Sequence, residues 1–243
     1  APPNPGHAAL MAQFTDSLGN PQAVTTPPEI DVDVTNGVDR WVFIGTGRLL
    51  AQSDLSDATI ANQQQTFYAL RDGTTTTPLK ITAPLTRNDL VKLDPAAAAG
   101  NERITGLKSK PAKGWYDDLP ISPNERIVTP VKAALDVVTY AGRQPQSDPC
   151  LTGEPATLYA RSFGTGASLL ELGGVAVAGI AEAEGAVGLE VTIFSDSSGP
   201  QSASGIDIRI AVTSGNTGDV VFQQVNPPSE LAAHRMSWRL LGQ

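Results

Sequence analysis

Hydrophobic and polar residues alternate along much of this chain with a period of two, which is typical of half-buried β-strands. The first clear run, residues 30–34, starts directly after Glu29. Asn36-Gly37 follows, and this pair favours a tight hairpin turn because both residues tolerate positive φ. Residues 41–44 are apolar and aromatic, and they predict the returning strand of the hairpin.

Similar runs continue to the end of the chain, and Gly, Ser, Asn or Asp separates nearly every pair of them. The expected strands cover residues 65–70, 74–81, 125–130, 134–140, 158–161, 174–180, 187–194, 206–213, 220–225 and 236–241. Many short strands at close spacing favour a β-sandwich or a β-propeller over a fold built of βαβ units. The sequence therefore predicts an all-β protein.

A recurring unit favours the propeller. Residues 41–70 and 140–161 both run from a strand through a polar loop to a short motif, Phe67-Tyr68-Ala69-Leu70 in the first and Leu158-Tyr159-Ala160-Arg161 in the second. Recurrence of this kind is typical of propeller blades, each of which is a small antiparallel sheet. We predict a partial or complete β-propeller of the quinoprotein-like type, with long loops and little helix.

Two segments depart from the strand pattern. Residues 1–28 are rich in Pro, Asn and Gly, and they predict an extended N-terminal arm that leans on a propeller-like domain formed by residues 29–243. Inside that domain, residues 84–113 are predicted to be an irregular excursion from the sheets. This excursion contains the only expected helix, around residues 87–93, and an alanine run at residues 96–99.

The charge balance argues against a nucleic-acid partner. The formal net charge is −8, and binding to phosphates requires a basic face. Lys108, Lys110 and Lys113 form the nearest candidate, but Pro111 interrupts their spacing and a solvated loop explains them better.

The sequence also has no apolar stretch long enough to span a bilayer. Cys150 is the only cysteine, which rules out an intrachain disulfide and a cysteine-based zinc cluster.

One segment partly imitates a calcium-binding loop. In Asp31-x-Asp33-x-Thr35-Asn36-Gly37-x-Asp39, alternating oxygen ligands could converge on Ca²⁺. The glycine lies one place late, however, and Val42 occupies the position where such loops place a carboxylate. We therefore predict an ordinary strand and hairpin here and no metal ligand, with calcium kept as an alternative.

Catalytic arrangements are not evident either. His7 and His234 lie near the chain ends, far from any serine in a nucleophile-elbow setting. Asp117 and Asp118 are neighbours that would point to opposite faces of a strand, so they do not form an acid/base pair, and we expect them in solvent or capping a turn. The sequence predicts no catalytic or cofactor-binding residue and favours a protein that is not an enzyme.

Glycine and tryptophan residues are assigned to the framework. Gly45-Thr46-Gly47 and Gly164-Thr165-Gly166 lack the following Lys-Ser/Thr of a phosphate-binding loop, so we predict tight turns at strand ends. Trp41, Trp115 and Trp238 could form a ligand-stacking platform, but burial between sheets is the commoner use of tryptophan. Core packing is the prediction for all three.

Several of these segments also resemble a known family. The matching pieces are Gly19-Asn20-Pro21-Gln22 with Thr25 and Pro28-Glu29, Trp41-Val42-Phe43-Ile44-Gly45-Thr46-Gly47-Arg48, Phe67-Tyr68-Ala69-Leu70 with Asp72, Gly114-Trp115-Tyr116 with Leu119-Pro120, Glu125-Arg126-Ile127-Val128, Asp148-Pro149-Cys150 with Gly153, Leu158-Tyr159-Ala160, and Arg235-Met236-Ser237-Trp238-Arg239. In these eight pieces, taken in order, the sequence resembles the C-terminal propeller of PilC/PilY-type proteins, the tip adhesins and pilus-assembly factors of type IV pili in Gram-negative bacteria.

The resemblance implies a pilus-associated (fimbrial) protein at the cell surface, secreted or held in the periplasm. Expected partners are minor pilins or other pilus components and a host or abiotic surface, with no residue assigned to these contacts. The family propeller is longer, so the chain corresponds to its closing blades and would be completed by a missing N-terminal part or by another copy. The calcium loop that family members often carry would lie upstream of Ala1, and the family usually has Gly where Glu154 stands.

Two other functions stay open on the sequence. An open sheet edge could be completed by a neighbouring chain through strand addition, which would make the protein a structural subunit of an extracellular assembly. A propeller could also be a quinone-dependent dehydrogenase, because fold alone does not set function. The lack of adjacent cysteines and of a convincing metal cluster counts against that enzyme.

Overall fold

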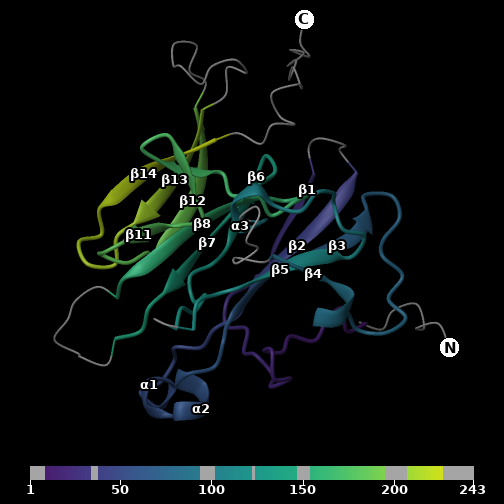
Figure 1. Ribbon diagram of the computed structural model, residues 1–243, viewed down its shortest axis with the longest axis horizontal. Coiled ribbons are helices and arrows are strands. Elements are labelled where there is room, and N and C mark those ends of the chain that lie inside the picture. Colours follow the sequence, from purple (N-terminus) through teal and green to yellow (C-terminus); the bar gives the residue numbers. More distant parts are fainter. Residues whose placement is uncertain are drawn as a thin grey trace, which may run out of the picture.

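The computed structural model describes residues 9–33, 38–93, 102–121, 124–146, 154–194 and 207–226. Strands dominate these residues, and they form three sheets and one short hairpin (Figure 1). The first sheet has the strand order β1-β2-β3-β5-β4, the second has β11-β8-β7-β6, and the third has β12-β13-β14. Strands β9 and β10 pair only with each other.

The elements have the following bounds. The strands are β1 (Glu29–Val32), β2 (Asp39–Gly45), β3 (Thr66–Thr74), β4 (Val91–Lys92), β5 (Gly114–Asp118), β6 (Lys132–Ala134), β7 (Val137–Arg143), β8 (Ala156–Ser162), β9 (Leu170–Leu172), β10 (Val175–Val177), β11 (Ile180–Glu182), β12 (Gly188–Phe194), β13 (Asp207–Thr213) and β14 (Val220–Val225). The helices are α1 (Ser53–Ser56), α2 (Ala58–Ala61), α3 (Glu102–Thr105) and the 3₁₀ turn η1 (Arg87–Asp89).

Each sheet is built on three consecutive antiparallel strands, namely β1-β2-β3, β6-β7-β8 and β12-β13-β14. A further antiparallel strand joins the first two of these units, β5 beside β3 and β11 beside β8. This repeated unit is the arrangement found in propeller blades. The prediction of an all-β chain made of short antiparallel sheets with little helix is confirmed.

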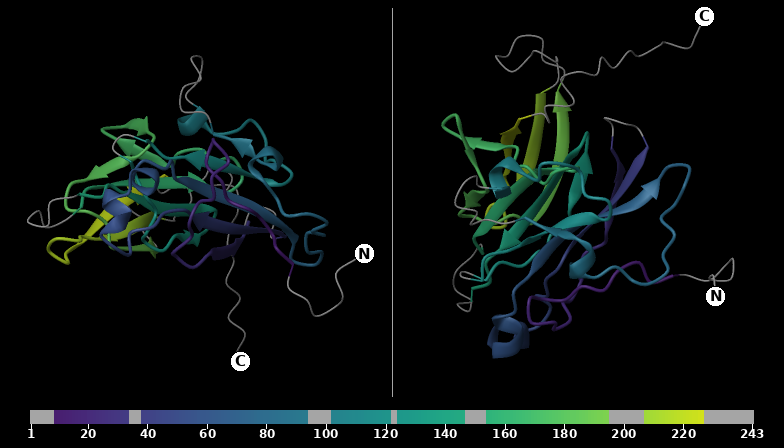
Figure 2. Two further views of the ribbon diagram at one scale, coloured as in Figure 1. Left: turned by 90° about the horizontal axis from the view of Figure 1, so that it is seen from below. Right: turned by 45° about the vertical axis from the view of Figure 1, so that its right-hand side comes forward.

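The three sheets pack face to face (Figures 1 and 2). The core between the first and second sheets is mostly aromatic and includes Trp41, Phe67, Trp115, Tyr140 and Tyr159. The core between the second and third sheets is aliphatic; its main members are Val137, Leu158, Leu189, Ile208, Ile210 and Val212. Alternation along the strands produces both cores, because every second residue faces the neighbouring sheet.

The recurring motif occupies equivalent places in the first two sheets. Phe67 and Ala69 on β3 face the second sheet, whereas Tyr68 faces the opposite side. Leu158 and Ala160 on β8 face the third sheet in the same way, and Tyr159 faces back toward the first. The motif therefore marks a repeated structural unit with one orientation, as the sequence analysis predicted.

The N-terminal segment covers the outer face of the first sheet. Met11, Ala12 and Phe14 pack on the face that Tyr68 and Leu70 present. The segment has no long strand and is held by isolated bridges, of which one joins Ala12 to Leu85. Strand β1 begins at Glu29, the residue at which the alternating pattern starts.

The helix expected at residues 87–93 is absent from the structure and is a wrong prediction. Thr86 and Asp89 form a capping box that closes the single turn η1, since both the backbone N–H and the hydroxyl of Thr86 donate to the Asp89 carboxylate. The chain then extends as β4, which pairs in parallel with β5, and the Leu93 side chain is buried in the aromatic core. Part of the predicted excursion thus belongs to the first sheet.

Other expected strands also differ. Residues 134–140 form no single run, because Leu135 and Asp136 make a tight turn with φ of +51° and +62° between β6 and β7. The turn contains neither Gly nor Asn, which usually indicate a tight hairpin turn, so the sequence did not predict it. Of residues 125–130, Arg126 forms one isolated bridge with Arg143 and no strand follows. Residues 174–180 span the end of a Gly173-Gly174 hairpin turn, β10 and the start of β11.

Some predictions fall outside the described residues. They are the Asn36-Gly37 turn, the alanine run at 96–99, the segments around Cys150 and Gly153, the strand at 236–241, and the side chains His7, His234 and Trp238. Within the part of the chain that is described, no helix has the length and apolar character needed to cross a membrane.

Candidate functional site

Strand β5 carries the most polar part of the interior, and its two neighbouring aspartates point to opposite faces. Asp117 faces the second sheet, where it meets Arg103 and Arg161. Asp118 faces the N-terminal segment, where it meets Arg87 and Lys92. The predicted opposite orientation is correct. The expected place in solvent or at a turn is wrong, because both carboxylates are buried and each is matched by basic side chains.

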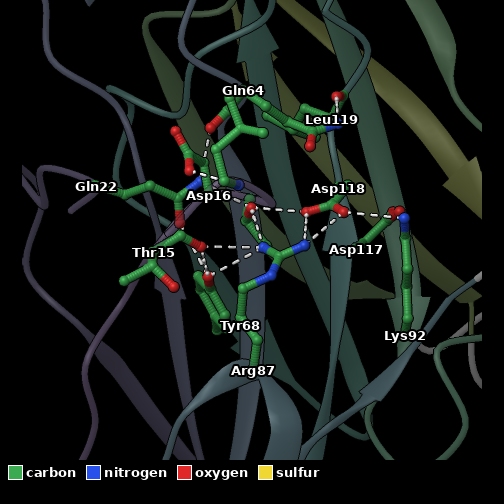
Figure 3. A network of polar contacts seen from close by, with 12 residues as sticks. Thr15, Asp16, Gln22, Gln64, Tyr68, Arg87, Lys92, Asp117, Asp118 and Leu119 are labelled. Carbon is green, nitrogen blue, oxygen red and sulfur yellow. Dashed lines mark hydrogen bonds and ion pairs between the residues drawn. The ribbon is translucent and has the colours of Figure 1, made fainter. Parts of the chain in front are cut away.

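The network around Asp118 holds the N-terminal segment to the first sheet (Figure 3). Arg87 donates to both Asp118 oxygens, at 2.9 Å from Nη2 to Oδ1 and 2.7 Å from Nη2 to Oδ2. Its Nη1 donates to the Thr15 carbonyl at 3.1 Å, and its guanidinium lies 4.2 Å from the ring centroid of Tyr116. Burial opposes ionisation of Arg87, but hydrogen bonds to Asp118 outweigh it and raise the pKa of the guanidinium.

Tyr68 extends this network to the far side of the segment. Its hydroxyl lies 3.0 Å from the Thr15 carbonyl and 2.9 Å from Oε1 of Gln22. Gln22 in turn donates to the Gln64 carbonyl at 2.7 Å (Figure 3). Burial raises the pKa of Tyr68, so the hydroxyl stays protonated and remains a donor. These contacts fasten the N-terminal segment to the first sheet.

The network around Asp117 joins the first two sheets. Arg103 on α3 donates to Oδ1 from Nε at 2.9 Å and from Nη2 at 2.8 Å. Arg161 on β8 donates to Oδ2 from Nη2 at 3.1 Å, and the Tyr140 hydroxyl on β7 donates to the same oxygen at 2.8 Å. Arg161 also donates from Nη1 to the carbonyl oxygen of Arg103. Four elements therefore converge on one buried carboxylate.

A second buried carboxylate lies at the other end of this interface. Glu125 accepts the hydroxyl hydrogens of Tyr159 at 2.7 Å and of Thr157 at 2.5 Å. Burial raises the pKa of Glu125, and the two hydroxyl donors only partly offset that effect. Gly142 passes directly over the carboxylate, and a Cβ at this position would meet Oε2 at 2.2 Å. Glu125 is thus enclosed by its neighbours and does not face a cavity.

The glycines assigned to turns have two different roles. Gly164 and Thr165 do lie in a turn after β8, with Gly166 at a φ of +69°. Gly45 and Gly47 instead make room for Ile127, since a Cβ on either would come within 3 Å of it. The Ile127 N–H donates to the Thr46 carbonyl at 3.0 Å, which fastens the segment that crosses between the first two sheets. For Gly45-Thr46-Gly47, close packing replaces the predicted turn.

The remaining candidate residues are framework residues. Trp41 and Trp115 are fully buried in the aromatic core, as predicted. Asp33 of the calcium-like segment is buried and lies 2.5 Å from Lys110 Nζ, so its carboxylate has a cationic partner. Among residues with described positions, no three His, Cys, Asp or Glu side chains gather into a possible metal site. Lys113 pairs with Asp89, and Lys108 is exposed, which agrees with a solvated loop.

Several exposed apolar side chains lie on the third sheet and on the β9–β10 hairpin. On the edge strand β14, Val220, Val221 and Phe222 are 51%, 53% and 51% exposed. Phe194 on β12 lies 6.1 Å from Phe222 between ring centroids, on the face turned away from the second sheet. Leu172 and Val175 flank the tip of the hairpin and are exposed as well.

Comparison with known proteins gives one informative match. No protein-family model matches this sequence, and no curated protein matches it. The crystal structure of the C-terminal domain of PilY1 from Pseudomonas aeruginosa matches with a TM-score of 0.57 and 18% sequence identity. The match covers 90% of this chain and 48% of that one.

The two folds are alike. The resemblance of the sequence to PilC/PilY-type propellers is therefore confirmed at the level of the fold. This chain spans about half the length of the PilY1 domain structure that it matches.

Proposed function

We propose that this chain is a non-enzymatic module of the type IV pilus system, acting as a tip adhesin or as a factor in pilus biogenesis. The observation that carries the proposal is the combination of eight family-like segments in order with a fold like that of the PilY1 C-terminal domain over 90% of the chain. Both the segments and the fold point to the same family. Neither separates adhesion from assembly.

Five of the eight family-like segments meet in one region, which explains what these five have in common. Residues 41–48, 67–70, 114–116, 125–128 and 158–160 all contribute to the interface between the first two sheets. Residues of this kind set the packing of a fold and do not by themselves recognise a partner. The resemblance therefore supports a shared scaffold, and the partner-binding residues are expected elsewhere.

A role without catalysis is supported by the state of the charged side chains. Asp117 and Asp118 are bound by guanidinium groups, and Glu125 is enclosed by hydroxyl donors and Gly142. A general base needs a carboxylate within reach of substrate, and these three are engaged by the protein itself. We propose a location outside the cytoplasm, at the cell surface or in the periplasm, with pilus components or an external surface as partners.

Deletion of the gene tests this proposal. Pili are counted by electron microscopy, pilin is measured by immunoblot, and attachment is scored on host cells and on an abiotic surface. A biogenesis factor predicts fewer pili with unchanged pilin synthesis, whereas a tip adhesin predicts normal pili with reduced attachment. The full-length gene must restore the phenotype in either case. Normal pili together with normal attachment would contradict the proposal.

A structural subunit completed by strand addition is a second candidate. The third sheet has three described strands where the first two have five and four, and its edge strand β14 presents three half-exposed apolar residues. Among the described residues, no further strand pairs with β14, and an unpaired strand edge favours pairing with another chain. Light scattering after size exclusion tests it: the subunit predicts concentration-dependent dimers or larger species, and a monomer at all concentrations would rule it out.

A further inference from the structure

A cavity of about 130 Å³ lies where three parts of the chain meet beside the first sheet. Its apolar wall consists of Pro21 and Ala23 from the N-terminal segment and Ile60 from α2. Its polar wall includes Arg48, Gln65 and Arg126. This cavity is separate from both carboxylate networks on β5, and the proposed pilus role does not depend on it.

Arg126 is an unusual cation in this wall. Its side chain is only 1% exposed, yet its hydrogen-bond acceptors are all carbonyl oxygens, those of Arg48 at 2.8 Å, Asp54 at 2.9 Å and Ala61 at 3.3 Å. Its Nε is buried without a hydrogen-bond partner. Burial lowers the pKa of Arg126, and the charges of Asp54 and Glu154 only partly offset this effect.

The nearby carboxylate of Asp54 is already occupied. Arg48 donates to its Oδ1 from Nε at 2.6 Å, and the backbone N–H groups of Leu50 and Ala51 donate to its Oδ2. Backbone and guanidinium donors together hold the pKa of Asp54 below its usual value. Asp54 therefore pairs directly with Arg48, and among the described residues no carboxylate accepts a hydrogen bond from Arg126.

Gln65 adds an unused acceptor to the same wall. The side chain is 4% exposed, and its amide nitrogen donates to the Gln63 carbonyl at 3.1 Å. Its Oε1 is buried and has no hydrogen-bond partner. A buried polar atom without a partner costs free energy unless a water or a ligand satisfies it. Two residues of the cavity wall thus each contain a buried polar atom without a partner, a donor on the cation Arg126 and a neutral acceptor on Gln65.

We propose that this cavity binds a small free hydroxy acid, that is, an organic carboxylate with a hydroxyl group on the neighbouring carbon. The carboxylate pairs with Arg126, the hydroxyl donates to Gln65 Oε1, and the carbon skeleton contacts the apolar wall. Both polar atoms are enclosed in the structure, so binding includes small rotations of these two side chains.

The shape and charge of the cavity select this chemistry. An engineered apolar cavity of about 150 Å³ holds benzene, so 130 Å³ suits a ligand of about six non-hydrogen atoms. Phosphate brings more charge than one unpaired cation balances, and a simple anion leaves Gln65 Oε1 without a donor. Lactate has a suitable size and carries both groups.

Titration of the full chain with lactate and with propionate, monitored by NMR, tests the proposal. The two acids differ by one hydroxyl, and a buried hydrogen bond corresponds to about tenfold in affinity. We expect saturable shifts at residues around the cavity, with lactate about tenfold tighter than propionate. The variant Gln65→Met should bring the two affinities together, because it removes the acceptor while keeping the side-chain length.

A second variant keeps the test independent of the polar groups. Ala23→Leu fills the cavity without touching the hydrogen bonds of Arg126, and it should abolish binding of both acids. Ala9→Leu, an exposed position on the same segment, is the matched control and should bind as the unaltered chain does.

Three results would overturn the proposal. The first is the absence of saturable shifts with any of the acids, which would mean that water alone fills the cavity. The second is equal affinity for lactate and propionate in the unaltered chain. The third is binding that survives Ala23→Leu, which would place the acid elsewhere on the surface.

Discussion

The two interfaces between the sheets are built by different means. The first joins the first and second sheets through stacked aromatic rings, with 3.9 Å between the centroids of Phe67 and Tyr140, and through the ionic network at Asp117. The second joins the second and third sheets through aliphatic side chains such as Leu158 and Ile210. Lys132 and Glu190 form a salt bridge at the exposed rim of the second interface, and within the described ranges none crosses its buried part.

Because of this difference, the two interfaces contribute in different ways to holding the sheets together and to fixing their relative position. Aliphatic contacts are non-directional, so they stabilise a range of similar packings. A carboxylate with two guanidinium partners requires one geometry, and removing a partner leaves a charge buried without compensation. We infer that the first interface fixes how two blades sit together, whereas the second mainly contributes apolar burial.

The largest expected effect comes from removing the charge at the centre of the first interface. Asp117→Asn keeps the shape of the side chain but leaves Arg103 and Arg161 without a counter-charge, so the free energy of unfolding should fall by about 3–5 kcal/mol. Urea unfolding followed by circular dichroism measures it. Asp118→Asn, on the opposite face of the same strand, is the control and should mainly loosen the N-terminal segment. Equal loss in both variants would remove the distinction between the two faces.

A smaller loss is expected from Tyr140→Phe. The hydroxyl donates to Asp117, and hydrogen bonds to charged groups contribute about 1.5–3 kcal/mol. The ring and its stacking are retained, so the variant separates the polar from the aromatic part of the first interface. Thermal unfolding gives the value. A loss below about 0.5 kcal/mol would show that the two arginines alone satisfy Asp117.

The aliphatic interface should tolerate a change of shape. Ile210→Leu keeps the apolar volume, and such swaps usually cost less than about 1.5 kcal/mol. We expect a loss of about 1 kcal/mol with unchanged spectra, measured by the same urea titration. A loss as large as that of Asp117→Asn would mean that the second interface is as specific as the first.

The smallest effect is a pH dependence at Glu125. Its pKa is raised in the folded chain, so the folded state holds the proton more strongly than the unfolded state does. The contribution of Glu125 to stability is therefore fully present below the unfolded value of 4.5 and is lost as pH rises through the raised pKa. Glu125→Gln should flatten this fall in a series of unfolding curves from acid to neutral pH. A variant with the same pH profile as the unaltered chain would contradict it.

Much of the fold could be predicted from the alternation of apolar and polar residues and from the residues at the turns. Strands β2, β3, β8, β12, β13 and β14 lie within or across the predicted segments, because alternate residues of a strand point to opposite faces. Strands β12, β13 and β14 have one face in a core, whereas β2, β3 and β8 have a core on each face. The helix at 87–93 failed for the opposite reason. A local capping box and the burial of Leu93 in a sheet core override helical spacing there.

The buried networks could not be predicted from the sequence. Asp117 is 14 residues from Arg103 and 44 from Arg161, and only the folded chain brings them together. One indication was present: the two aspartates sit inside the aromatic and apolar run Gly114–Leu119, where an exposed turn is not expected. The cavity at Arg126 depends in the same way on three segments far apart in the chain.

The placement of tryptophan has a practical consequence for following this protein in solution. Trp41 and Trp115 are both fully buried between the first two sheets, and the Trp115 indole donates to the Phe163 carbonyl at 2.7 Å. Strands β12, β13 and β14 contain no tryptophan. In a Trp238→Phe background, the remaining two chromophores emit from one interface. A red shift of their emission would then report the separation of the first and second sheets. Loosening of the third sheet alone would leave the emission unchanged.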